Sequence, residues 1–352
     1  MAADAMRLPP LRLVTSQKDP LSGQSIFEQR LIAAVTERYG SQVDLTSVGG
    51  VRSSADIRLP TRTRAMPWPM RRWLGKLALP SHGLIHRLDL GAPPSHGEIL
   101  TVHDLAPLRF DDEGTLPRDA IESIRAAAAV ITVSAFSASE IAALAGRSDV
   151  DVIPNGVERD VFDAKPSADV ELRALGVSQP YVLHLGGGSK RKNLDELAKA
   201  WRMVETLSVA PTLVMCGPDS ERRSRLFQEM TSVRVVGRLD RLAVIGLMKR
   251  SSGVVVPSTY EGFGLPVLEA LAAGVPVVAA RMASLPEVGG AEAVLVAPTA
   301  EGLADGLRQV LLRRGQLDAA VARGVRRAEG CTWETVAERH IDVYERIMPS
   351  RG

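Results

Sequence analysis

Residues 254–280 constrain the fold of this chain more than any other segment. They read VVVPSTYEGFGLPVLEALAAGVPVVAA, in which apolar β-branched runs at Val254–Val256 and Val275–Ala280 flank a helix-forming segment, Leu265–Ala273, that stops at Gly274. A helix placed between two short apolar strands is typical of the crossover that joins parallel strands. The segment therefore predicts an α/β protein with a parallel sheet.

The entrance of the predicted helix suits a polar ligand. Pro266 has no backbone N–H to satisfy and fits the first helical position, so the N–H groups of Gly264 and Leu265 are expected to point outward from the positive end of the helix dipole. Glu261 and Glu269 frame this turn. On one helix, eight residues would separate them by about 12 Å, too far for the roughly 5 Å carboxylate pair of a retaining glycosidase. We therefore expect the two glutamates to contact different parts of one long ligand.

The length and composition predict a two-domain globular protein. A chain of 352 residues fits two domains of roughly 150–180 residues. Apolar residues make up 45% and charged residues 24%, which excludes a disordered or fibrous chain. The net charge of +2 argues against a nucleic-acid partner. Cys216 and Cys331 fit no metal or disulfide spacing and are expected to be free thiols in a reducing compartment.

Strand-like runs alternate with helical segments along the whole chain, as in open α/β sheets. The expected strands are 11–15, 43–48, 98–102, 130–133 and 150–153 in a first unit, and 181–185, 212–216, 233–236, 253–256, 275–280 and 293–296 in a second. We expect two doubly wound sheets, joined by a connector over Glu158–Gln179. The tail Trp333–Ile347 has the spacing of an amphipathic helix.

The segment Glu261–Glu269, EGFGLPVLE, resembles the E-x7-E signature of the GT-B glycosyltransferases of family 4, the group 1 and mannosyltransferase-like type. These are retaining enzymes that use sugar nucleotides. The resemblance implies that Glu261 lies beside the transferred sugar and that Glu269 binds the ribose hydroxyls. Phe263, with Gly264 and Leu265, is implied to contact the donor as well.

The same resemblance implies a GT-B fold, in which two Rossmann-like doubly wound parallel-sheet domains face a central cleft. Residues 1–165 would form the acceptor domain and residues 166–332 the nucleotide-sugar donor domain. A final helix over 333–350 would pack back on the first domain.

Three glycines and three cations follow the expected strand 181–185. Glycines let backbone N–H groups approach a phosphate, and the cations would neutralise the charge that grows on a departing diphosphate. A solvated turn is the alternative, because the loop fits neither the dinucleotide fingerprint nor the P-loop. The loop resembles the family's G…RKN segment, which implies that Gly187, Lys192 and a neighbouring Arg bind the pyrophosphate. Glycine and serine stand where relatives place that Arg, so Arg191 takes the role.

Two segments of the first domain also resemble family elements. Gly23 follows the first strand, where relatives have a glycine-rich loop over the donor phosphates; a plain entry into the helix Ile26–Arg38, capped by Ser22 or Ser25, is the alternative. His103 follows a strand and matches a family histidine that lies beside the donor sugar, which implies a catalytic role. Its neighbour Asp104 would orient the imidazole or cap the next turn, on the acceptor side of the site.

Three further residues have weaker assignments. Asn155, in a Pro-Asn-Gly sequence, forms a tight turn or contacts the acceptor. Ser134 is best interpreted as the N-cap of a helix over 135–145, with acceptor contact as the alternative. Leu239 lies where relatives bind the nucleotide base through backbone groups.

A basic segment, residues 57–88, contains tryptophan and no acidic residue. Its seven cations are Arg58, Arg62, Arg64, Arg71, Arg72, Lys76 and Arg87. Together with Trp68 and Trp73 they suit an interfacial segment that faces anionic headgroups. A solvated basic face or a disordered loop is the alternative. No run approaches 18 apolar residues, which predicts a cytoplasmic protein, attached at most peripherally to the inner face of the plasma membrane.

The resemblance implies a retaining hexosyltransferase that moves a hexose from a nucleoside-diphosphate sugar to a saccharide or lipid-linked saccharide acceptor in cell-surface glycan synthesis. A TVHDL…PNG…RKN series favours GDP-mannose, with a UDP-sugar as the alternative. Because cations and a helix N-terminus would neutralise the diphosphate, we expect no metal and no other cofactor. A sugar-nucleotide epimerase and a non-catalytic sugar-nucleotide-binding protein remain alternatives, whereas an NAD oxidoreductase is disfavoured because no G-x-G-x-x-G follows a strand.

Overall fold

The computed structural model describes residues 9–17, 23–80 and 83–348. The chain divides into two compact units, of which unit 1 combines the residues up to Gly156 with those from Trp333 on, and unit 2 is Val157–Thr332. Residues 157–165, assigned to the first domain from the sequence, thus belong to unit 2. The reason is visible in Asp160, whose carboxylate pairs with Arg241 of unit 2.

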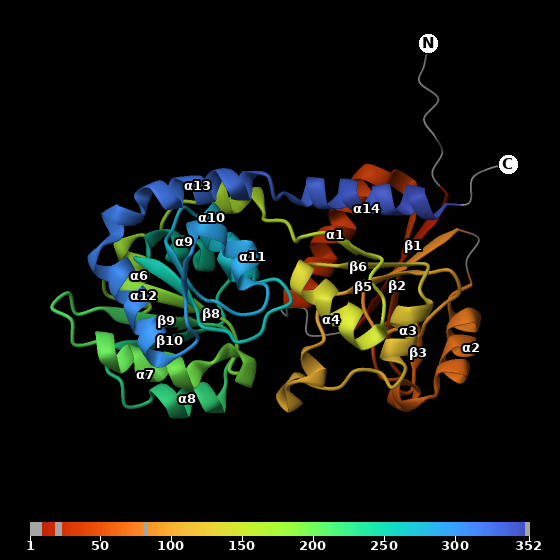
Figure 1. Ribbon diagram of the computed structural model, residues 1–352, viewed down its shortest axis with the longest axis horizontal. Helices are drawn as coiled ribbons and strands as arrows, with labels where there is room; N and C mark the ends of the chain where they lie inside the picture. Colours follow the sequence, from red (N-terminus) through yellow and green to blue (C-terminus); the bar gives the residue numbers. More distant parts are fainter. Residues whose placement is uncertain (1–8, 18–22, 81–82, 349–352) are drawn as a thin grey trace, which may run out of the picture. The chain divides into compact units, whose positions relative to one another are not determined.

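Unit 1 is built on a parallel sheet (Figure 1). The order of its strands is β3-β2-β1-β4-β5-β6-β7. Its strands are β1 Leu11–Ser16, β2 Val43–Gly50, β3 Ile57–Leu59, β4 Leu84–Arg87, β5 Ile99–Val102, β6 Ala129–Thr132 and β7 Val150–Val152. Leu11 of β1 pairs with Val43 on one side and with Leu84 on the other. The order of the strands reverses between β1 and β4, which is where open sheets of this kind bind ligands.

Helices cover the sheet of unit 1. They are α1 Gly23–Tyr39, α2 Trp68–Ala78, α3 Ala120–Ala126, α4 Ala135–Ala145 and α14 Trp333–Ile347. The last helix of the chain, α14, lies alongside α1 (Figure 1). Phe27 of α1 contacts both Trp333 and His103 edge to face, so the chain's final helix is part of the unit 1 core.

Unit 2 contains a second parallel sheet with the order β10-β9-β8-β11-β12-β13. Its strands are β8 Tyr181–Leu185, β9 Thr212–Cys216, β10 Val233–Gly237, β11 Gly253–Val256, β12 Val277–Ala280 and β13 Val294–Val296. Its helices are α5 Arg159–Asp163, α6 Asp169–Ala174, α7 Leu194–Val204, α8 Glu221–Phe227, α9 Arg241–Arg250, α10 Leu265–Ala272, α11 Leu285–Gly289, α12 Ala300–Leu312 and α13 Asp318–Glu329. Trp201 of α7 and Leu307 of α12 are fully buried in its core. The strand order reverses between β8 and β11.

The two doubly wound parallel sheets confirm the predicted fold class. The connector over residues 158–179 contains the short helices α5 and α6. Two local predictions were wrong. Helix α1 begins at Gly23, which places Ser25 inside the helix rather than at its cap. The other proposed cap, Ser22, lies outside the described residues. The α10 helix begins at Leu265, so Pro266 occupies its second position instead of its first.

The strands β3 and β4 were not predicted. Every residue of β4 is buried. The strand was not predicted because two of its residues, His86 and Arg87, are polar and interrupt the apolar pattern expected of a buried strand. The Arg87 guanidinium pairs with Glu98 at 2.7 Å and donates to the carbonyl of Ala92. These partners satisfy a charge that would otherwise be costly to bury.

The basic segment is also not the uniform cationic surface that its sequence predicts. Arg71 is 1% exposed, because its guanidinium forms an ion pair with the buried Asp119 and donates to the carbonyls of Gly91 and Ala92. Arg71 and Arg87 are therefore internal anchors, and their acidic partners lie outside the segment. Arg58, Arg62, Arg64, Arg72 and Lys76 are exposed.

A buried polar chain connects α14 to the sheet of unit 1. His86 of β4 lies 2.8 Å from the Tyr344 hydroxyl and 2.7 Å from the Thr101 hydroxyl. His340, also fully buried, donates from Nδ1 to the carbonyl of Val336. Burial lowers the pKa of His340 to about 4 and lowers the pKa of His86 well below its usual value. Both imidazoles are therefore neutral at pH 7.

Acid is expected to destabilise unit 1 through His340. Its folded-state pKa of about 4 lies below the ordinary value of 6.5, so the unfolded chain binds a proton that the folded chain rejects. The resulting stability is fully present above pH 6.5 and is lost as the pH falls toward 4, by roughly 3 kcal/mol at 1.36 kcal/mol per pKa unit. Urea unfolding can be monitored for unit 1 through hydrogen exchange of the β4 and β5 amides. The free energy of unfolding should fall more steeply between pH 6.5 and 4 in wild type than in His340→Gln. Equal slopes would contradict this prediction.

Candidate active site

The switch point of unit 2 brings together the loops after β8 and β11. The Thr259 amide donates to the carbonyl of Arg191 at 2.8 Å. The side chain of Asn193 donates to the carbonyl of Pro257 at 3.0 Å and to that of Pro298 at 3.0 Å. These bonds place the cations of the first loop against Glu261 of the second.

Glu261 is held by both predicted phosphate-binding cations. Its Oε1 lies 2.6 Å from Lys192 Nζ and its Oε2 lies 2.6 Å from Arg191 Nη1. Ser258 donates a further hydrogen bond to Oε1 at 2.7 Å. Burial raises the pKa of the Glu261 carboxyl, but Lys192 and Arg191 outweigh that effect and lower the pKa to about 2. The site therefore holds a fixed carboxylate acceptor beside two fixed cations.

The glycine loop after β8 is shaped by two arginines that the sequence analysis did not single out. Arg223, 1% exposed, donates to the carbonyls of Gly186 and Gly217, both at 3.3 Å, and Arg222 donates to the carbonyl of Gly188 at 3.3 Å. Both arginines come from α8. A Cβ at Gly188 would lie only 1.8 Å from the Ser220 hydroxyl, so the close approach of these loops requires glycine there. The predicted Gly187 lies between Gly186 and Gly188, whose carbonyls accept these hydrogen bonds.

The side chain of Ser284 fixes the turn before α10. Its single hydroxyl proton is within hydrogen-bond reach of two carbonyl oxygens, with the Ser284 oxygen 2.9 Å from that of Glu261 and 2.6 Å from that of Phe263. Gly264 is the N-cap residue of α10 and has a φ of 104°, a left-handed conformation that favours glycine. Leu265 then begins the helix, while the Phe263 side chain is buried. Helix α10 thus starts directly after the Glu261 cluster.

Glu269 lies on α10 and contacts a cation of its own. Its Oε1 lies 3.4 Å from Arg241 Nη1. Burial raises the pKa of Glu269, and the attraction of Arg241 opposes that rise. The structure therefore gives the two glutamates separate basic partners: Lys192 and Arg191 for Glu261, and Arg241 for Glu269.

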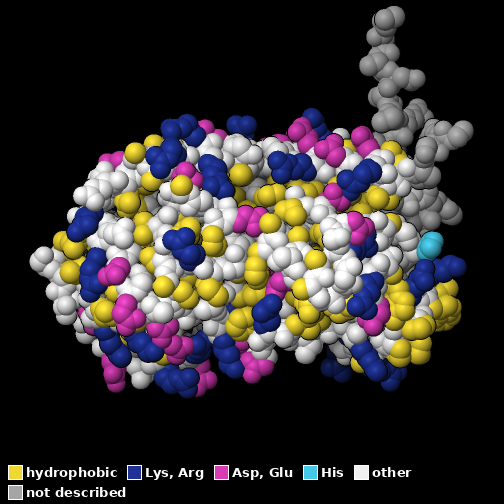
Figure 2. Space-filling view, viewed as in Figure 1, with side chains coloured by type: hydrophobic (Ala, Val, Ile, Leu, Met, Phe, Trp, Pro, Cys, Tyr) yellow, Lys and Arg dark blue, Asp and Glu magenta, His cyan; other side chains and the backbone are white. Residues whose placement is uncertain are grey.

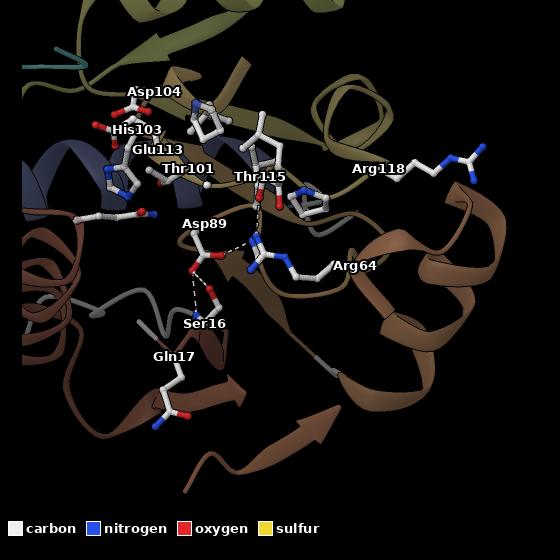
Figure 3. A pocket seen from close by; sticks show the side chains of 18 of the residues that line it. Ser16, Gln17, Arg64, Asp89, Thr101, His103, Asp104, Glu113, Thr115 and Arg118 are labelled. Atoms are coloured by element: carbon white, nitrogen blue, oxygen red, sulfur yellow. Dashed lines mark hydrogen bonds between the residues drawn. The ribbon is translucent and has the colours of Figure 1, made fainter. Parts of the chain in front are cut away.

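Unit 1 has a pocket of about 800 Å³ at the carboxyl ends of β1, β4 and β5 (Figure 3). It contains His103 and Asp104, both predicted as site residues. It also contains residues the sequence analysis did not select for a site, among them Ser16, Gln17, Asp89, Thr101, Glu113 and Thr115. Asp89 accepts hydrogen bonds from the amide and hydroxyl of Ser16, at 2.9 and 2.7 Å. The pocket is thus lined by residues at the carboxyl ends of strands on both sides of the switch point.

The roles of the predicted residues in this pocket differ. His103 donates from Nε2 to the carbonyl of Leu88 at 3.0 Å, which fixes its ring at the pocket wall. Asp104 accepts from the amide of Ala106 at 3.0 Å and so caps the following turn, one of the two roles considered for it. The Arg64 guanidinium donates to the carbonyl of Thr115 at 3.0 Å.

The remaining predicted residues lie at separate places. Gly23 is the first residue of α1, and Leu239 lies half-buried in the loop between β10 and α9. Ser134 is fully buried and accepts from the amide of Ser137 at 3.0 Å, so it caps α4 as predicted. Asn155 is buried, and its Oδ1 has no hydrogen-bond partner among the described residues.

Two features are absent from the described parts of the chain. No three His, Cys, Asp or Glu side chains in them are grouped so that they could hold a metal ion. No helix within residues 9–17, 23–80 and 83–348 is long and apolar enough to cross a membrane.

Comparison with known families assigns the segment that carries the Glu261 cluster. Residues 172–327 match the family described as Glycosyl transferases group 1. This segment is a group 1 glycosyltransferase domain. The glycosyltransferase domain contains the glycine loop, the paired cations and both glutamates of the predicted signature.

Relatives and solved structures extend the likeness beyond the glycosyltransferase domain. The chain is 29% identical over 280 residues to an O-antigen chain mannosyltransferase B of Escherichia coli, covering 76% of this chain and 73% of that protein. It is 31% identical over 257 residues to a glycogen synthase of Mycobacterium tuberculosis, covering 68% of this chain and 59% of that protein. The chain thus spans less than two thirds of the second relative.

A solved structure supports the fold assignment. Sucrose-phosphate synthase from Thermosynechococcus elongatus matches with a TM-score of 0.76 and 21% sequence identity, over 96% of this chain and 99% of that one. The glycosyltransferase domain and unit 1 together therefore have the GT-B fold.

Proposed function

We propose that this chain is a retaining hexosyltransferase that moves a hexose from a nucleoside-diphosphate sugar to a saccharide or lipid-linked saccharide acceptor, in the synthesis of a cell-surface glycan. The observation that carries the proposal is the cluster of Glu261, Lys192 and Arg191 at the switch point of unit 2. GDP-mannose is the favoured donor, supported by the name of the E. coli relative, a mannosyltransferase. A UDP-sugar is the alternative.

The barrier of such a transfer is charge separation. The bond between the anomeric carbon and the diphosphate oxygen breaks, the sugar becomes cationic, and the diphosphate gains negative charge. Lys192 and Arg191 would donate hydrogen bonds to the phosphates, together with the N–H groups after Gly264, and preorganised donors of this kind stabilise the transition state. Glu261 would accept from sugar hydroxyls, since its pKa of about 2 keeps it ionised. Glu269 would bind the ribose.

Unit 1 would supply the acceptor side. Its pocket is lined by hydroxyl, amide and carboxylate groups that suit a polyhydroxylated acceptor. His103, at the wall of this pocket, would contact the transferred sugar, as the family resemblance implies. Because the diphosphate would be neutralised by side chains and a helix N-terminus, we propose that the reaction requires no metal ion.

A donor panel tests the proposed function. GDP-mannose and UDP-sugars are to be screened by thermal shift, because a ligand at 100 times its dissociation constant stabilises a protein by about 2.7 kcal/mol. The stabilising donor should then yield free nucleoside diphosphate and a glycoside when a saccharide or lipid-linked acceptor is added, and excess EDTA should leave most of that activity. Binding without turnover would favour a sugar-nucleotide-binding protein. Conversion of the sugar without nucleotide release would favour an epimerase, and strict dependence on Mg²⁺ or Mn²⁺ would contradict the metal-free mechanism.

The outer face of α2 supports a membrane-bound acceptor. Met70, Trp73 and Leu77 are 55%, 64% and 59% exposed and follow one another at helical spacing. Figure 2 shows this hydrophobic cluster over α2, with Lys and Arg side chains beside it. Arg72 and Lys76 lie on the same helix, and the Arg72 guanidinium lies 5.8 Å from the centre of the Trp68 ring. We propose that this face, the α2 surface, binds anionic headgroups at the cytoplasmic side of the plasma membrane.

Charge reversal on the α2 surface is expected to weaken vesicle binding. Each cation near an anionic surface contributes about 1 kcal/mol, so Arg72→Glu with Lys76→Glu should lower partitioning at least tenfold, and salt should weaken wild-type binding. Sedimentation with phosphatidylserine-containing vesicles measures this. Lys199→Glu with Arg202→Glu, a reversal of two exposed cations on α7, is the matched control. Equal partitioning of both double variants and wild type at low salt would return the segment to a solvated basic face.

A further inference from the structure

Arg241 connects Glu269 to a third helix. Its Nε and Nη2 each lie 3.0 Å from one carboxylate oxygen of Asp160, which gives a two-pronged ion pair. Its remaining Nη1 points to Glu269, at 3.4 Å. The guanidinium is planar and rigid, so fixing one edge on Asp160 also fixes the direction of the other.

The three side chains come from three separate helices. Asp160 is the second residue of α5, Arg241 is the first residue of α9, and Glu269 lies in the middle of α10. Their side chains are 38%, 29% and 24% exposed. A partly buried charge holds one geometry better than a fully solvated one, because it is less screened by water. The arrangement is therefore suited to fixing a carboxylate at the edge of a ligand site.

The contact to Glu269 is made by only one of its oxygens. Among the described residues, Oε1 accepts the hydrogen bond from Arg241 and no hydrogen bond reaches Oε2. A ribose carries two adjacent hydroxyl donors, and a carboxylate oxygen has two acceptor positions. An Oε2 left open in a fixed orientation is what the binding of such a diol requires.

We propose that Asp160 and Arg241 are positioning residues that hold Glu269 in the orientation in which it accepts hydrogen bonds from the ribose hydroxyls of the nucleotide. This inference rests on the proposed function, in which Glu269 binds the ribose. Arg241 acts on the nucleotide only through Glu269. Without Asp160, the Arg241 guanidinium would be free to rotate and to donate to both oxygens of Glu269. Without Arg241, the Glu269 carboxylate would lose the contact that fixes its orientation.

The test compares ribonucleotides with their 2′-deoxy forms. Binding of GDP and UDP, and of dGDP and dUDP, is to be measured by calorimetry on the full chain. Wild type should prefer the ribonucleotide by about tenfold, the size of one hydrogen bond to a charged group. Glu269→Gln, Arg241→Met and Asp160→Asn should each lose most of that preference, while Arg241→Lys should retain part of it. Arg241→Met in the Glu269→Gln background should not lower the preference for the ribonucleotide any further.

Arg250→Met is the matched control. Arg250 lies on the same helix, α9, and forms an ion pair with Asp169 of α6. This variant should keep the full preference for ribose. A merely structural Arg241 would weaken GDP and dGDP binding equally, and that result would overturn the inference. Asp160→Asn keeps the size of the side chain and tests the same connection if Arg241→Met does not fold.

Failure of the inference and failure of the proposed function give different results. If wild type binds neither GDP nor UDP, the proposed donor is wrong and the inference falls with it. If Glu269→Gln loses the ribose preference but Arg241→Met and Asp160→Asn keep it, only the positioning role is excluded.

Discussion

Replacement of Lys192 by alanine is expected to lower turnover by roughly 10²-fold or more, with the fold intact. One preorganised donor to a transition-state oxyanion is worth about 3 kcal/mol, and the Lys192 side chain is only 12% exposed, beside the glycine loop. Glu261 would keep its bonds from Arg191 and Ser258, so the substitution leaves no buried carboxylate without a partner. The expected loss is therefore in catalysis and not in folding.

The rate of nucleoside diphosphate release measures this effect. Lys199→Ala is the matched control, because Lys199 is a 62% exposed cation paired with Glu196 on the next helix, α7. A variant with wild-type kcat and a raised KM would show that Lys192 binds the donor equally in the ground and transition states. Wild-type values of both constants in a folded variant would remove Lys192 from the phosphate site.

Replacement of Arg71 by methionine is expected to destabilise unit 1 by about 3–5 kcal/mol, the usual effect of removing one partner of a buried ion pair. Asp119 would be left buried with its charge, and the carbonyl of Gly91 would lose its Arg71 donor, whereas the carbonyl of Ala92 would keep the hydrogen bond from Arg87. Arg71 lies on α2, so we expect the position of this helix to depend on the ion pair. The helix also packs closely, because a Cβ at Gly75 would lie 1.9 Å from the carbonyl oxygen of Pro94.

Urea unfolding, with hydrogen exchange of the β4 and β5 amides as the report on unit 1, checks the expected loss. Arg72→Met, at the adjacent and exposed position, should change the free energy of unfolding by less than about 0.5 kcal/mol. Arg71→Met combined with Asp119→Leu should recover much of the loss, because the pair is then replaced by apolar groups. Equal stability of Arg71→Met and wild type would show that the ion pair does not anchor α2.

The sequence predicted best those elements whose residue types match their surroundings. The strands β8, β9 and β11 were predicted to their end residues, because each is a short run of mostly apolar residues that is buried on both faces. The helix α4 was predicted with equal accuracy, from the serine that caps it. The Glu261 turn was found because a motif of fixed spacing carries it.

What the sequence did not predict depends on partners that are distant along the chain. Strand β4 contains His86 and Arg87, which are compatible with burial only because Tyr344, Thr101 and Glu98 provide partners. Arg71 was misinterpreted as a surface cation for the same reason, since Asp119 lies 48 residues away. The contacts of Arg222 and Arg223 with the glycine loop are likewise set by the folding of α8, which no local pattern indicates.

The return of α14 to unit 1 determines the order in which the two cores can be completed during synthesis. Unit 2 is one uninterrupted stretch of chain, so all of its residues are synthesised before those of α14. Unit 1 begins first but must wait for the last helix, which supplies the Tyr344 hydroxyl to His86 and the Trp333 ring to Phe27. A stop codon or a proteolytic cut just after Thr332 would therefore remove no residue of unit 2. It would, however, remove α14 and leave the core of unit 1 incomplete, although most of unit 1 is synthesised first.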